Sequence, residues 1–131
     1  MSVLVVGSVA LDTVQTWKGR REDVLGGSAT YFSLAAALFC PVQLVAVVGE
    51  DFPDRYLEVL RSKGVDLEGL TKVSGGRTFR WGGVYADDFS TRKTDFTELN
   101  VFAQFNPILP ESYQQSRYVL LANIQPALQA R

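Results

Sequence analysis

The sequence contains no histidine and a single cysteine, Cys40. An internal disulfide, a cysteine-based zinc site and a histidine-dependent catalytic triad are therefore excluded. The net charge of −1 provides no basic surface for nucleic acid or for an anionic membrane. The best apolar run, Val42–Val48, is far shorter than the roughly 20 residues that span a bilayer. Met1 is followed by no basic segment or cleavage site, so we expect a cytoplasmic protein without nucleic-acid or membrane partners.

What is present is an ordinary globular composition. Hydrophobic residues make up 47% of the 131 residues and charged residues 21%, which is typical of a folded chain rather than a disordered one. This length suffices for one domain with a hydrophobic core and is too short for two ordinary domains.

Apolar runs and helical patterns alternate along the chain. The runs at 3–6, 42–48 and 118–123 have the length and β-branched content of buried strands. A helix is predicted over 26–39, and another from Pro53 to Lys63 with Asp51 as its N-cap. This order predicts a parallel α/β sheet with helical crossovers. Residues 126–131 form only the first turn of a further helix, so we expect the chain to be part of a larger sheet that leaves an apolar face uncovered.

The junction between Leu25 and Phe39 is a candidate ligand site. Gly26 and Gly27 free the backbone from the steric limits of a Cβ, and Ser28 or Thr30 is expected to cap the helix that follows. The first N–H groups of such a helix suit a hydroxyl-rich or anionic ligand. The alternative is an ordinary loop-to-helix junction.

Asp12 is a second candidate. It follows the first buried strand, and open α/β sheets bind ligands at the carboxyl ends of their strands. The alternative is that Asp12 caps a helix or forms a turn. The segment from Gly7 to Asp12 lacks the Gly-x-Gly-x-x-Gly spacing, which argues against a nicotinamide dinucleotide.

Two further segments have a different pattern. Residues 13–24 are polar and predict an irregular excursion or a short exposed strand. Residues 78–105 alternate between apolar and polar side chains around a charged turn at 87–95, which predicts a hairpin. A small antiparallel layer of this kind, inserted into a parallel α/β domain, often covers a binding site.

The ordered set of motifs resembles the amino-terminal half of the ribokinase (PfkB) family of carbohydrate and nucleoside kinases. The motifs are the segment from Gly7 to Asp12, the Gly26-Gly27 pair, the run Val47–Pro53, and Lys-Gly-Val-Asp at 63–66. The resemblance covers essentially residues 1–131. Within the family, the sequence is most similar to the sugar and nucleoside kinase branch. It implies a ribokinase-like fold: part of a three-layer α/β/α parallel sheet with a small antiparallel β lid formed by segments 13–24 and 78–105.

The resemblance also implies roles for individual residues. Asp12 would hold substrate hydroxyls, and the backbone of Gly26 and Gly27 would approach the sugar, next to Ser28. Tyr31 stands where the family commonly has asparagine; a tyrosine can stack on a base or donate one hydroxyl. Two more candidates are Arg80, for a base or a phosphate, and Asn123, at the end of the last predicted strand. An alternating strand equally predicts a solvated position for Arg80.

The family's ATP- and Mg²⁺-binding parts have no counterpart in this sequence. The Asp-Thr-x-Gly-Ala-Gly-Asp stretch that carries the catalytic base and the Asn-x-x-Glu motif are both absent, as is an adenine pocket. Phosphoryl transfer depends on such positioning and charge-stabilising groups. The first hypothesis is therefore the amino-terminal part of an ATP-dependent sugar or nucleoside kinase, which carries the acceptor half-site and the lid and is not catalytic alone. The second is a non-catalytic ligand-binding module, or one that forms a homodimer through the lid.

Overall fold

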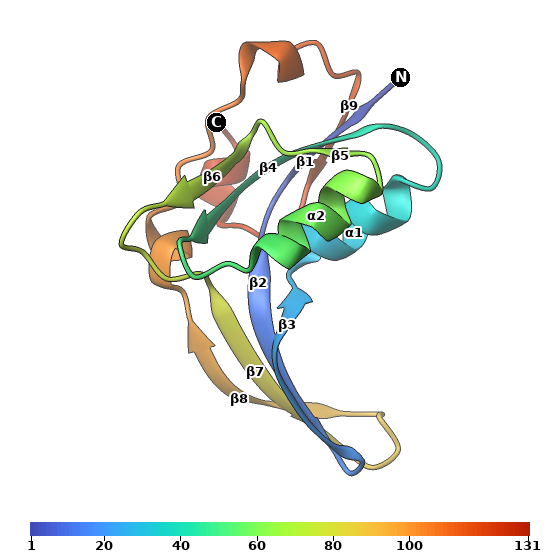
Figure 1. The fold of residues 1–131 in the computed structure, drawn as a ribbon, viewed down its shortest axis with the longest axis vertical. Coiled ribbons are helices and arrows are strands. Elements are labelled where there is room, and N and C mark those ends of the chain that lie inside the picture. Colours follow the sequence, from blue (N-terminus) through green and yellow to red (C-terminus); the bar gives the residue numbers. More distant parts are fainter.

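A parallel sheet forms the body of the molecule (Figure 1). The computed structural model describes all 131 residues. The strands β1 (Val3–Val6), β4 (Val42–Gly49) and β9 (Tyr118–Leu121) lie in the order β4-β1-β9, and each pairs in parallel with its neighbour. The short strands β5 (Val65–Asp66) and β6 (Leu70–Val73) both pair with the outer edge of β4. The three predicted strands are thus confirmed, and two short ones are added.

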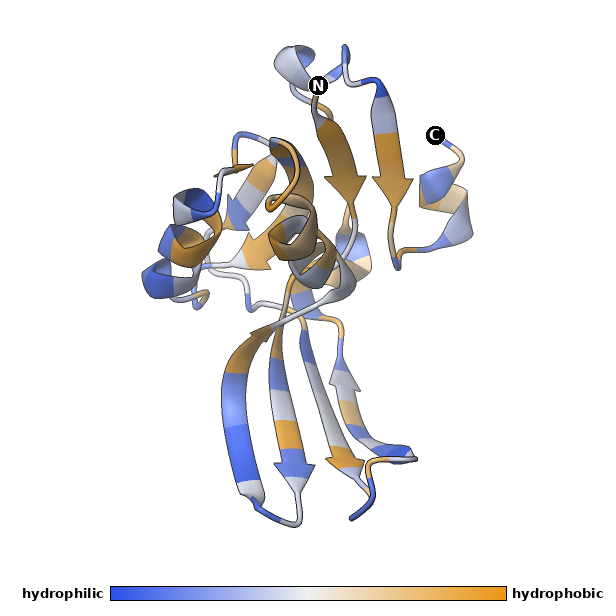
Figure 2. Ribbon diagram, turned by 90° about the vertical axis from the view of Figure 1, so that its right-hand side faces the viewer, coloured by the Kyte–Doolittle hydropathy of each residue, from blue (hydrophilic) through white to orange (hydrophobic).

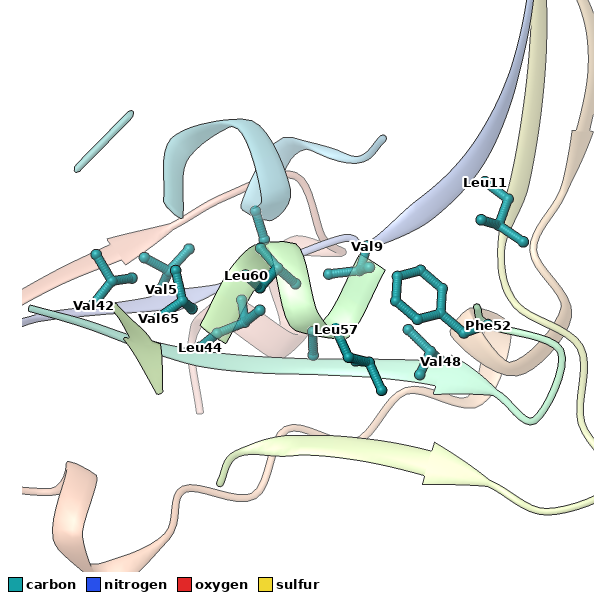
Figure 3. Packing of buried hydrophobic residues seen from close by; sticks show 12 residues of the cluster. Val5, Val9, Leu11, Val42, Leu44, Val48, Phe52, Leu57, Leu60 and Val65 are labelled. Carbon is teal, nitrogen blue, oxygen red and sulfur yellow. The ribbon is translucent and has the colours of Figure 1, made fainter. Parts of the chain in front are cut away.

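Two helices cover one face of this sheet. They are α1 (Ser28–Ala36) and α2 (Asp54–Ser62). Their buried residues pack on the side chains of β1 and β4 that point to that face, as Figure 3 shows. The strands are buried on both faces, which explains why they appear in the sequence as continuous apolar runs rather than alternating ones. The main residues of this cluster are Val5, Val9, Leu11, Val42, Leu44, Val48, Phe52, Leu57, Leu60 and Val65.

The opposite face has a thinner and less regular cover. It consists of two 3-10 turns, η1 (Asn100–Gln104) and η2 (Glu111–Tyr113), and of the one-turn helix α3 (Pro126–Gln129). A second cluster forms there from Leu4, Val6, Val45, Val47, Phe105, Tyr113 and Ile124. The predicted α/β architecture is confirmed, with a third layer that is largely built from irregular segments. No helix of the structure is long and apolar enough to cross a membrane.

A second, four-stranded sheet extends away from the body; we call it the arm (Figures 1 and 2). Its strands are β2 (Ala10–Thr16), β3 (Gly19–Gly26), β7 (Arg80–Tyr85) and β8 (Arg92–Glu98), in the order β3-β2-β7-β8. The β2–β3 and β7–β8 pairs are antiparallel, but β2 and β7 are parallel. The expected antiparallel layer is therefore a mixed sheet, because two separate hairpins join side by side.

The arm corrects the predicted boundaries. Residues 13–24 are neither irregular nor a short strand: they belong to a regular hairpin that begins at Ala10 and ends at Gly26. Asp12 accordingly lies within β2, which excludes the cap and turn alternatives. The return strand β8 ends at Glu98, and the chain then turns into η1 instead of continuing extended to Phe105.

Both helix starts also differ from the prediction. The residue that caps α1 is Gly27, with a φ of 98° and no side-chain hydrogen bond, whereas Thr30 is buried inside the helix. The residue that caps α2 is Pro53, not Asp51. Asp51 is unavailable because its carboxylate accepts hydrogen bonds from Thr78 instead.

Strand β9 is more exposed than its apolar sequence suggests. It pairs with β1 on one side only, so it forms an edge of the sheet. Tyr118, Val119 and Leu121 are about half exposed. Tyr118 also lines an apolar groove of about 420 Å³ beside α1, together with Phe32 and Phe39. The prediction of a buried strand is wrong here because neither a neighbouring strand nor a full helix covers β9.

Candidate substrate-binding site

A cavity of about 280 Å³ lies where the arm joins the body. The carboxyl end of β1, the start of α1 and the loop after β9 surround it from the body, and β2, β7 and β8 line it from the arm. Its lining residues are Ser8, Ala10, Asp12, Val14, Gly27, Ser28, Tyr31, Phe79, Trp81, Tyr85, Arg92 and Asn123. Five of the seven residues singled out in the sequence thus come together although they are separated by up to 111 positions, from Asp12 to Asn123.

Asp12 is the one acidic side chain that lines the cavity. No hydrogen bond or ion pair of the protein involves its carboxylate, and burial raises its pKa from 3.8 to about 6. Gly26 on the neighbouring strand makes this position possible, because a Cβ there would lie 2.0 Å from Oδ2 of Asp12. A partly buried carboxylate without a partner is costly to the fold, and its free oxygens are strong acceptors for hydroxyl groups.

Gly27 brings the backbone close to the end of β1. A Cβ at this position would lie 2.4 Å from the carbonyl oxygen of Ser8, and its φ of 98° disfavours other residues. The N–H of Ala29 donates to that same carbonyl (3.0 Å), and the N–H of Ser28 donates to the Ser8 hydroxyl (3.0 Å). These two N–H groups at the start of α1 are therefore already satisfied, contrary to the expectation that they face a ligand.

Two serine hydroxyls connect the body segments around the cavity. Oγ of Ser8 and Oγ of Ser28 are 3.0 Å apart, and the N–H of Asn123 donates to Oγ of Ser28 (3.2 Å). Each hydroxyl has one hydrogen, and the bond between the two serines uses only one of these hydrogens. One hydroxyl hydrogen thus remains to donate into the cavity.

Aromatic side chains make up much of the remaining wall. Tyr31 lies near Asp12, and burial followed by the charges of Asp12 and Tyr85 raises its pKa. The guanidinium of Arg92 lies 5.2 Å from the ring centroid of Trp81. The cavity therefore combines one carboxylate, hydroxyl groups and flat apolar surfaces, which suits a hydroxyl-bearing ligand with an apolar part.

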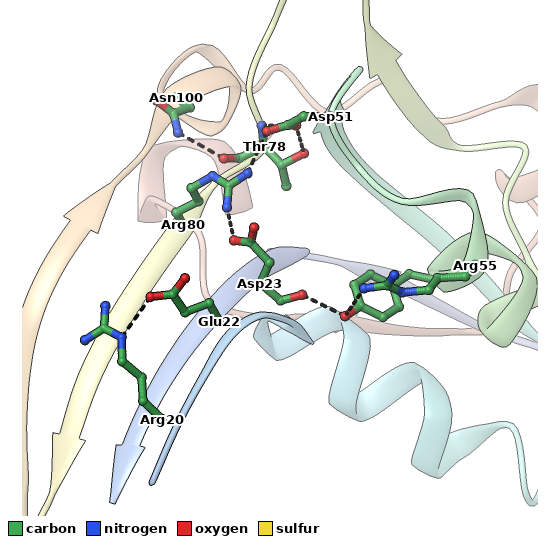
Figure 4. A network of polar contacts seen from close by, with 9 residues as sticks. Arg20, Glu22, Asp23, Asp51, Arg55, Thr78, Arg80 and Asn100 are labelled. Carbon is green, nitrogen blue, oxygen red and sulfur yellow. Dashed lines mark hydrogen bonds and ion pairs between the residues drawn. The ribbon is translucent and has the colours of Figure 1, made fainter.

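Arg80 does not lie in this cavity. It sits on the opposite side of β7 from Trp81, where its guanidinium binds the carboxylates of Asp23 and Asp51 (Figure 4). Its side chain is only 16% exposed. Asp23 reaches it from a bulge in β3, where the residue has a φ of 51°. Arg80 is thus committed to joining the arm to the body, which contradicts its placement at the acceptor site and its alternative placement on a solvated face.

Asp51 is the body residue in this junction. It accepts from the N–H of Thr78 (2.8 Å), from the Thr78 hydroxyl (2.7 Å) and from Arg80 (2.9 Å). Desolvation opposes its ionisation, but the hydrogen bonds from Thr78 and Arg80 prevail and lower its pKa. The fully buried Thr78 hydroxyl in turn accepts from the N–H of Gly49 (2.9 Å). The junction is therefore fixed by charge-assisted hydrogen bonds.

The sequence contained a signal for some of the residues that were not singled out. Successive side chains of a strand point to opposite faces, so residues at odd positions here share one face and Arg80 lies on the other. The odd positions include three residues of the cavity wall: Phe79, Trp81 and Tyr85. Ser8 and Arg92 had no comparable signal, because their positions depend on how the two hairpins pair.

The side chains of the structure form no cluster that suits a divalent cation. No group of three or more acidic, histidine or cysteine side chains lies close enough together to hold a metal ion. The cavity supplies a single carboxylate, whereas Mg²⁺ requires octahedral oxygen coordination, normally completed by further carboxylates, phosphates and water.

Comparisons with known proteins agree with this fold. No protein-family model matches the sequence. The chain is 30% identical over its whole length to the cytidine kinase of Thermococcus kodakarensis, of which it covers 46%. Its fold matches 46% of a nucleoside kinase from Methanocaldococcus jannaschii, described as an archaeal member of the ribokinase family, with a TM-score of 0.76 and 19% identity over 97% of the chain. It also matches 40% of the ribokinase of Cryptococcus neoformans bound to ADP (TM-score 0.67, 23% identity, 92% of the chain).

The parallel body with its attached arm is a ribokinase-like fold. In sequence and in fold, the chain is thus similar to part of the kinases of the ribokinase family. The chain spans slightly less than half the length of these relatives.

Proposed function

We propose that this chain is the acceptor-binding, amino-terminal part of an ATP-dependent sugar or nucleoside kinase. In this proposal the cavity between body and arm holds the substrate whose hydroxyl receives the γ-phosphoryl group. The arm, with its strands β2, β3, β7 and β8, acts as the lid and closes over the substrate to exclude water. The ATP, the Mg²⁺ and the catalytic base belong to the carboxyl-terminal half of the domain.

The observation that carries the proposal is the unpartnered carboxylate of Asp12 inside the cavity. Two adjacent substrate hydroxyls can donate to its two oxygens, and the free serine hydroxyl hydrogen can donate to a substrate oxygen. Such polar groups, placed in a mostly preformed cavity, fix the orientation of a small ligand. Among related structures, a nucleoside kinase from Burkholderia thailandensis was solved with inosine (TM-score 0.69, 18% identity, 78% of this chain and 36% of that one).

The exposed edge strand β9 supports the proposal that a carboxyl-terminal half completes the kinase domain. The free side of β9 and the apolar groove beside α1 leave hydrophobic surface uncovered, and a continuing sheet and helix would bury it. Because the donor-binding groups would come from that second half, we expect this chain to bind acceptors without turning them over.

Ligand-dependent thermal unfolding tests the proposal. Ribose, fructose, cytidine, inosine and ATP are added separately to the wild-type chain and to the Asp12→Asn variant. Because a ligand that binds the folded state stabilises it in proportion to its occupancy, at least one sugar or nucleoside should raise the melting temperature of the wild type. The shift should be lost in the variant, and ATP should give none. Stabilisation by ATP alone, or an equal shift in both proteins, would refute the proposal.

The outer edges of the arm favour a second candidate function. Strands β3 and β8 each have one unpaired side, and such edges can add a strand from another chain. In this second function, the chain is a non-catalytic module that forms a homodimer through the arm. Light scattering separates the two: a monomer over the whole concentration range excludes the dimer.

A further inference from the structure

The residues around the cavity belong to two parts of the molecule that meet at the base of the arm. Ser8, Ser28 and Asn123 come from the body, whereas Asp12 and Trp81 come from the arm. A ligand that contacts both sets needs them at a fixed distance from each other. The contacts that hold the base of the arm against the body therefore affect the geometry of the cavity.

Asp12 has no polar contact that would fix its own position. Burial is the one cause of its raised pKa, with no hydrogen bond from the protein to its carboxylate. Its place is set by the backbone of β2, where it pairs with Val24 of β3 on one side and with Trp81 of β7 on the other. The residues immediately before these two partners are Asp23 and Arg80.

Asp23 and Arg80 meet across the back of β2. Arg80 pairs with Leu11, the residue before Asp12, and so points to the face of the sheet opposite to Asp12 and Trp81. Its guanidinium binds the carboxylate of Asp23, which comes from the strand on the other side of β2 (Figure 4). This ion pair thus spans β2 close to Asp12, on the side away from the cavity.

The same guanidinium ties the pair to the body. Its Nη1 binds Asp23, and its Nη2 donates to Oδ2 of Asp51, in the loop after β4, at 2.9 Å. Asp23 has a second anchor on the body, because its carbonyl oxygen accepts from the hydroxyl of Tyr56 in α2 (2.7 Å). These bonds hold Asp23 at a φ of 51°, a conformation that non-glycine residues seldom adopt. The base of the arm is therefore fixed to two elements of the body.

We propose that Arg80 is a positioning residue for acceptor binding and that it acts through Asp23 and Asp51. We call these three side chains the Arg80 bridge. The bridge holds the base of the arm at the distance from the body at which the Asp12 carboxylate and the serine hydroxyls bind the same ligand. This inference rests on the proposed function, which assigns Asp12 to the acceptor. Because the bridge lies at the base of the arm, the distal ends of the hairpins remain free to move over a bound ligand.

The test uses two readouts on variants of the bridge. The first is the heat of binding of ribose, fructose, cytidine and inosine. The second is the pKa of Asp12, measured from its ¹³C carboxyl signal; since burial raises this pKa to about 6, it reports access of water to the cavity without any ligand. In Arg80→Met the pKa should fall toward its ordinary value of 3.8. Because a hydrogen bond to a charged group strengthens binding by about 10- to 100-fold, misplacing Asp12 should weaken the acceptor by about 10-fold or more.

Arg80→Lys separates positioning from a purely structural role. We expect the single lysine nitrogen to pair with Asp51, whose side chain is 27% exposed against 52% for Asp23, because the more buried carboxylate is costlier to leave unpaired. The lysine should therefore restore most of the stability that Arg80→Met loses. It should restore little of the affinity or of the Asp12 pKa, because Asp23 stays released.

A second variant keeps the test decisive if Arg80→Met does not fold. Asp23→Asn tolerates the positive φ and exchanges a charge-assisted hydrogen bond for a neutral one at an exposed position. It should lower the Asp12 pKa and weaken the acceptor about 2- to 5-fold, with little loss of stability. The matched control is the neighbouring Glu22→Gln, which removes an exposed ion pair with Arg20 inside β3 and should change neither readout.

The outcomes distinguish this inference from the proposed function. An Asp12 pKa and an affinity that stay unchanged in Arg80→Met and Asp23→Asn would overturn the positioning role and leave the acceptor site standing. Recovery of the affinity in Arg80→Lys in step with the stability would also overturn it, because the bridge would then act on the fold alone. Binding of none of the four ligands by the wild type would overturn the proposed function, and with it the role of the bridge in acceptor binding.

Discussion

Replacing Asp12 by asparagine should stabilise the fold and at the same time weaken acceptor binding. Burial raises the pKa of Asp12 to about 6, above its ordinary value of 3.8, so the folded chain holds this proton more tightly than the unfolded chain does. Ionisation of Asp12 therefore costs stability as the pH rises through this window. Asparagine has nearly the same shape and no charge to desolvate.

The size of the effect follows from the pKa difference. Each pKa unit corresponds to about 1.4 kcal/mol, which sets an upper limit of about 3 kcal/mol. Because the carboxylate faces an open cavity and keeps contact with water, we expect about 1–2 kcal/mol in the free energy of unfolding at pH 8. For a chain of this size, that is a rise of about 3–8 °C in the melting temperature.

Thermal unfolding followed by circular dichroism between pH 3 and pH 8 is the assay. The gain of Asp12→Asn over wild type should be largest at pH 8, shrink through pH 6 and vanish near pH 3, where the carboxyl is protonated in both states. Asp87→Asn, at an exposed position in the turn between β7 and β8, is the matched control. A variant less stable than wild type at pH 8, or a difference that does not depend on pH, would refute the reasoning.

Three further substitutions and one control test the junction, the cavity floor and the attachment of η2 to the body. Arg80→Met should cost about 3 kcal/mol by leaving Asp51 without its buried partner. The pKa of Asp51 is lowered in the fold, and protonation of its carboxylate removes the charge that Arg80 binds. The cost, measured by urea unfolding, should therefore fall as the pH drops below the ordinary aspartate range. A cost that does not depend on pH would contradict the pairing. Gly27→Ala should destabilise by about 2–3 kcal/mol, since both its φ of 98° and the Ser8 carbonyl 2.4 Å from a Cβ oppose it. Gly64→Ala, with φ of 89° and open space around it, should cost only about 1 kcal/mol in the same melts, and equal costs would argue against the close approach. Tyr113→Phe should cost about 1–2 kcal/mol by removing the hydroxyl that accepts from the N–H of Gly69 (3.2 Å) and donates to Asp66 (2.7 Å); unchanged stability would show those bonds to be dispensable.

Much of the body could be predicted from the sequence because its strands are buried on both faces. Runs such as Val42–Val48 have few other stable arrangements, and the helices between them require parallel pairing. Strand β5 escaped prediction because two residues are too few to show a pattern, and β6 because its sequence, Leu-Thr-Lys-Val, is not a continuous apolar run. The exposure of β9 could not be predicted, since an apolar run does not reveal whether a neighbour covers it.

The arm was harder because its structure depends on long-range pairing. Neither hairpin carries any sign that β2 will pair in parallel with β7, and that pairing decides which residues line the cavity. The sequence did predict Asp12, Gly27, Ser28, Tyr31 and Asn123 as site residues, and they converge. Neither of the two positions weighed for Arg80 is observed, because the neighbouring residues Arg80 and Trp81 point to opposite faces of β7 and the face of Arg80 meets Asp23 and Asp51.

A two-dimensional amide NMR titration of the ¹⁵N-labelled chain with cytidine tests the central claim most directly. If the cavity at the junction of body and arm binds the acceptor, the amide signals of Gly27, Ser28 and Asn123 should shift saturably. The same signals should stay in place when cytidine is added to Asp12→Asn. A spectrum that does not change, or shifts confined to the far end of the arm around Trp17 and Lys18, would contradict the account.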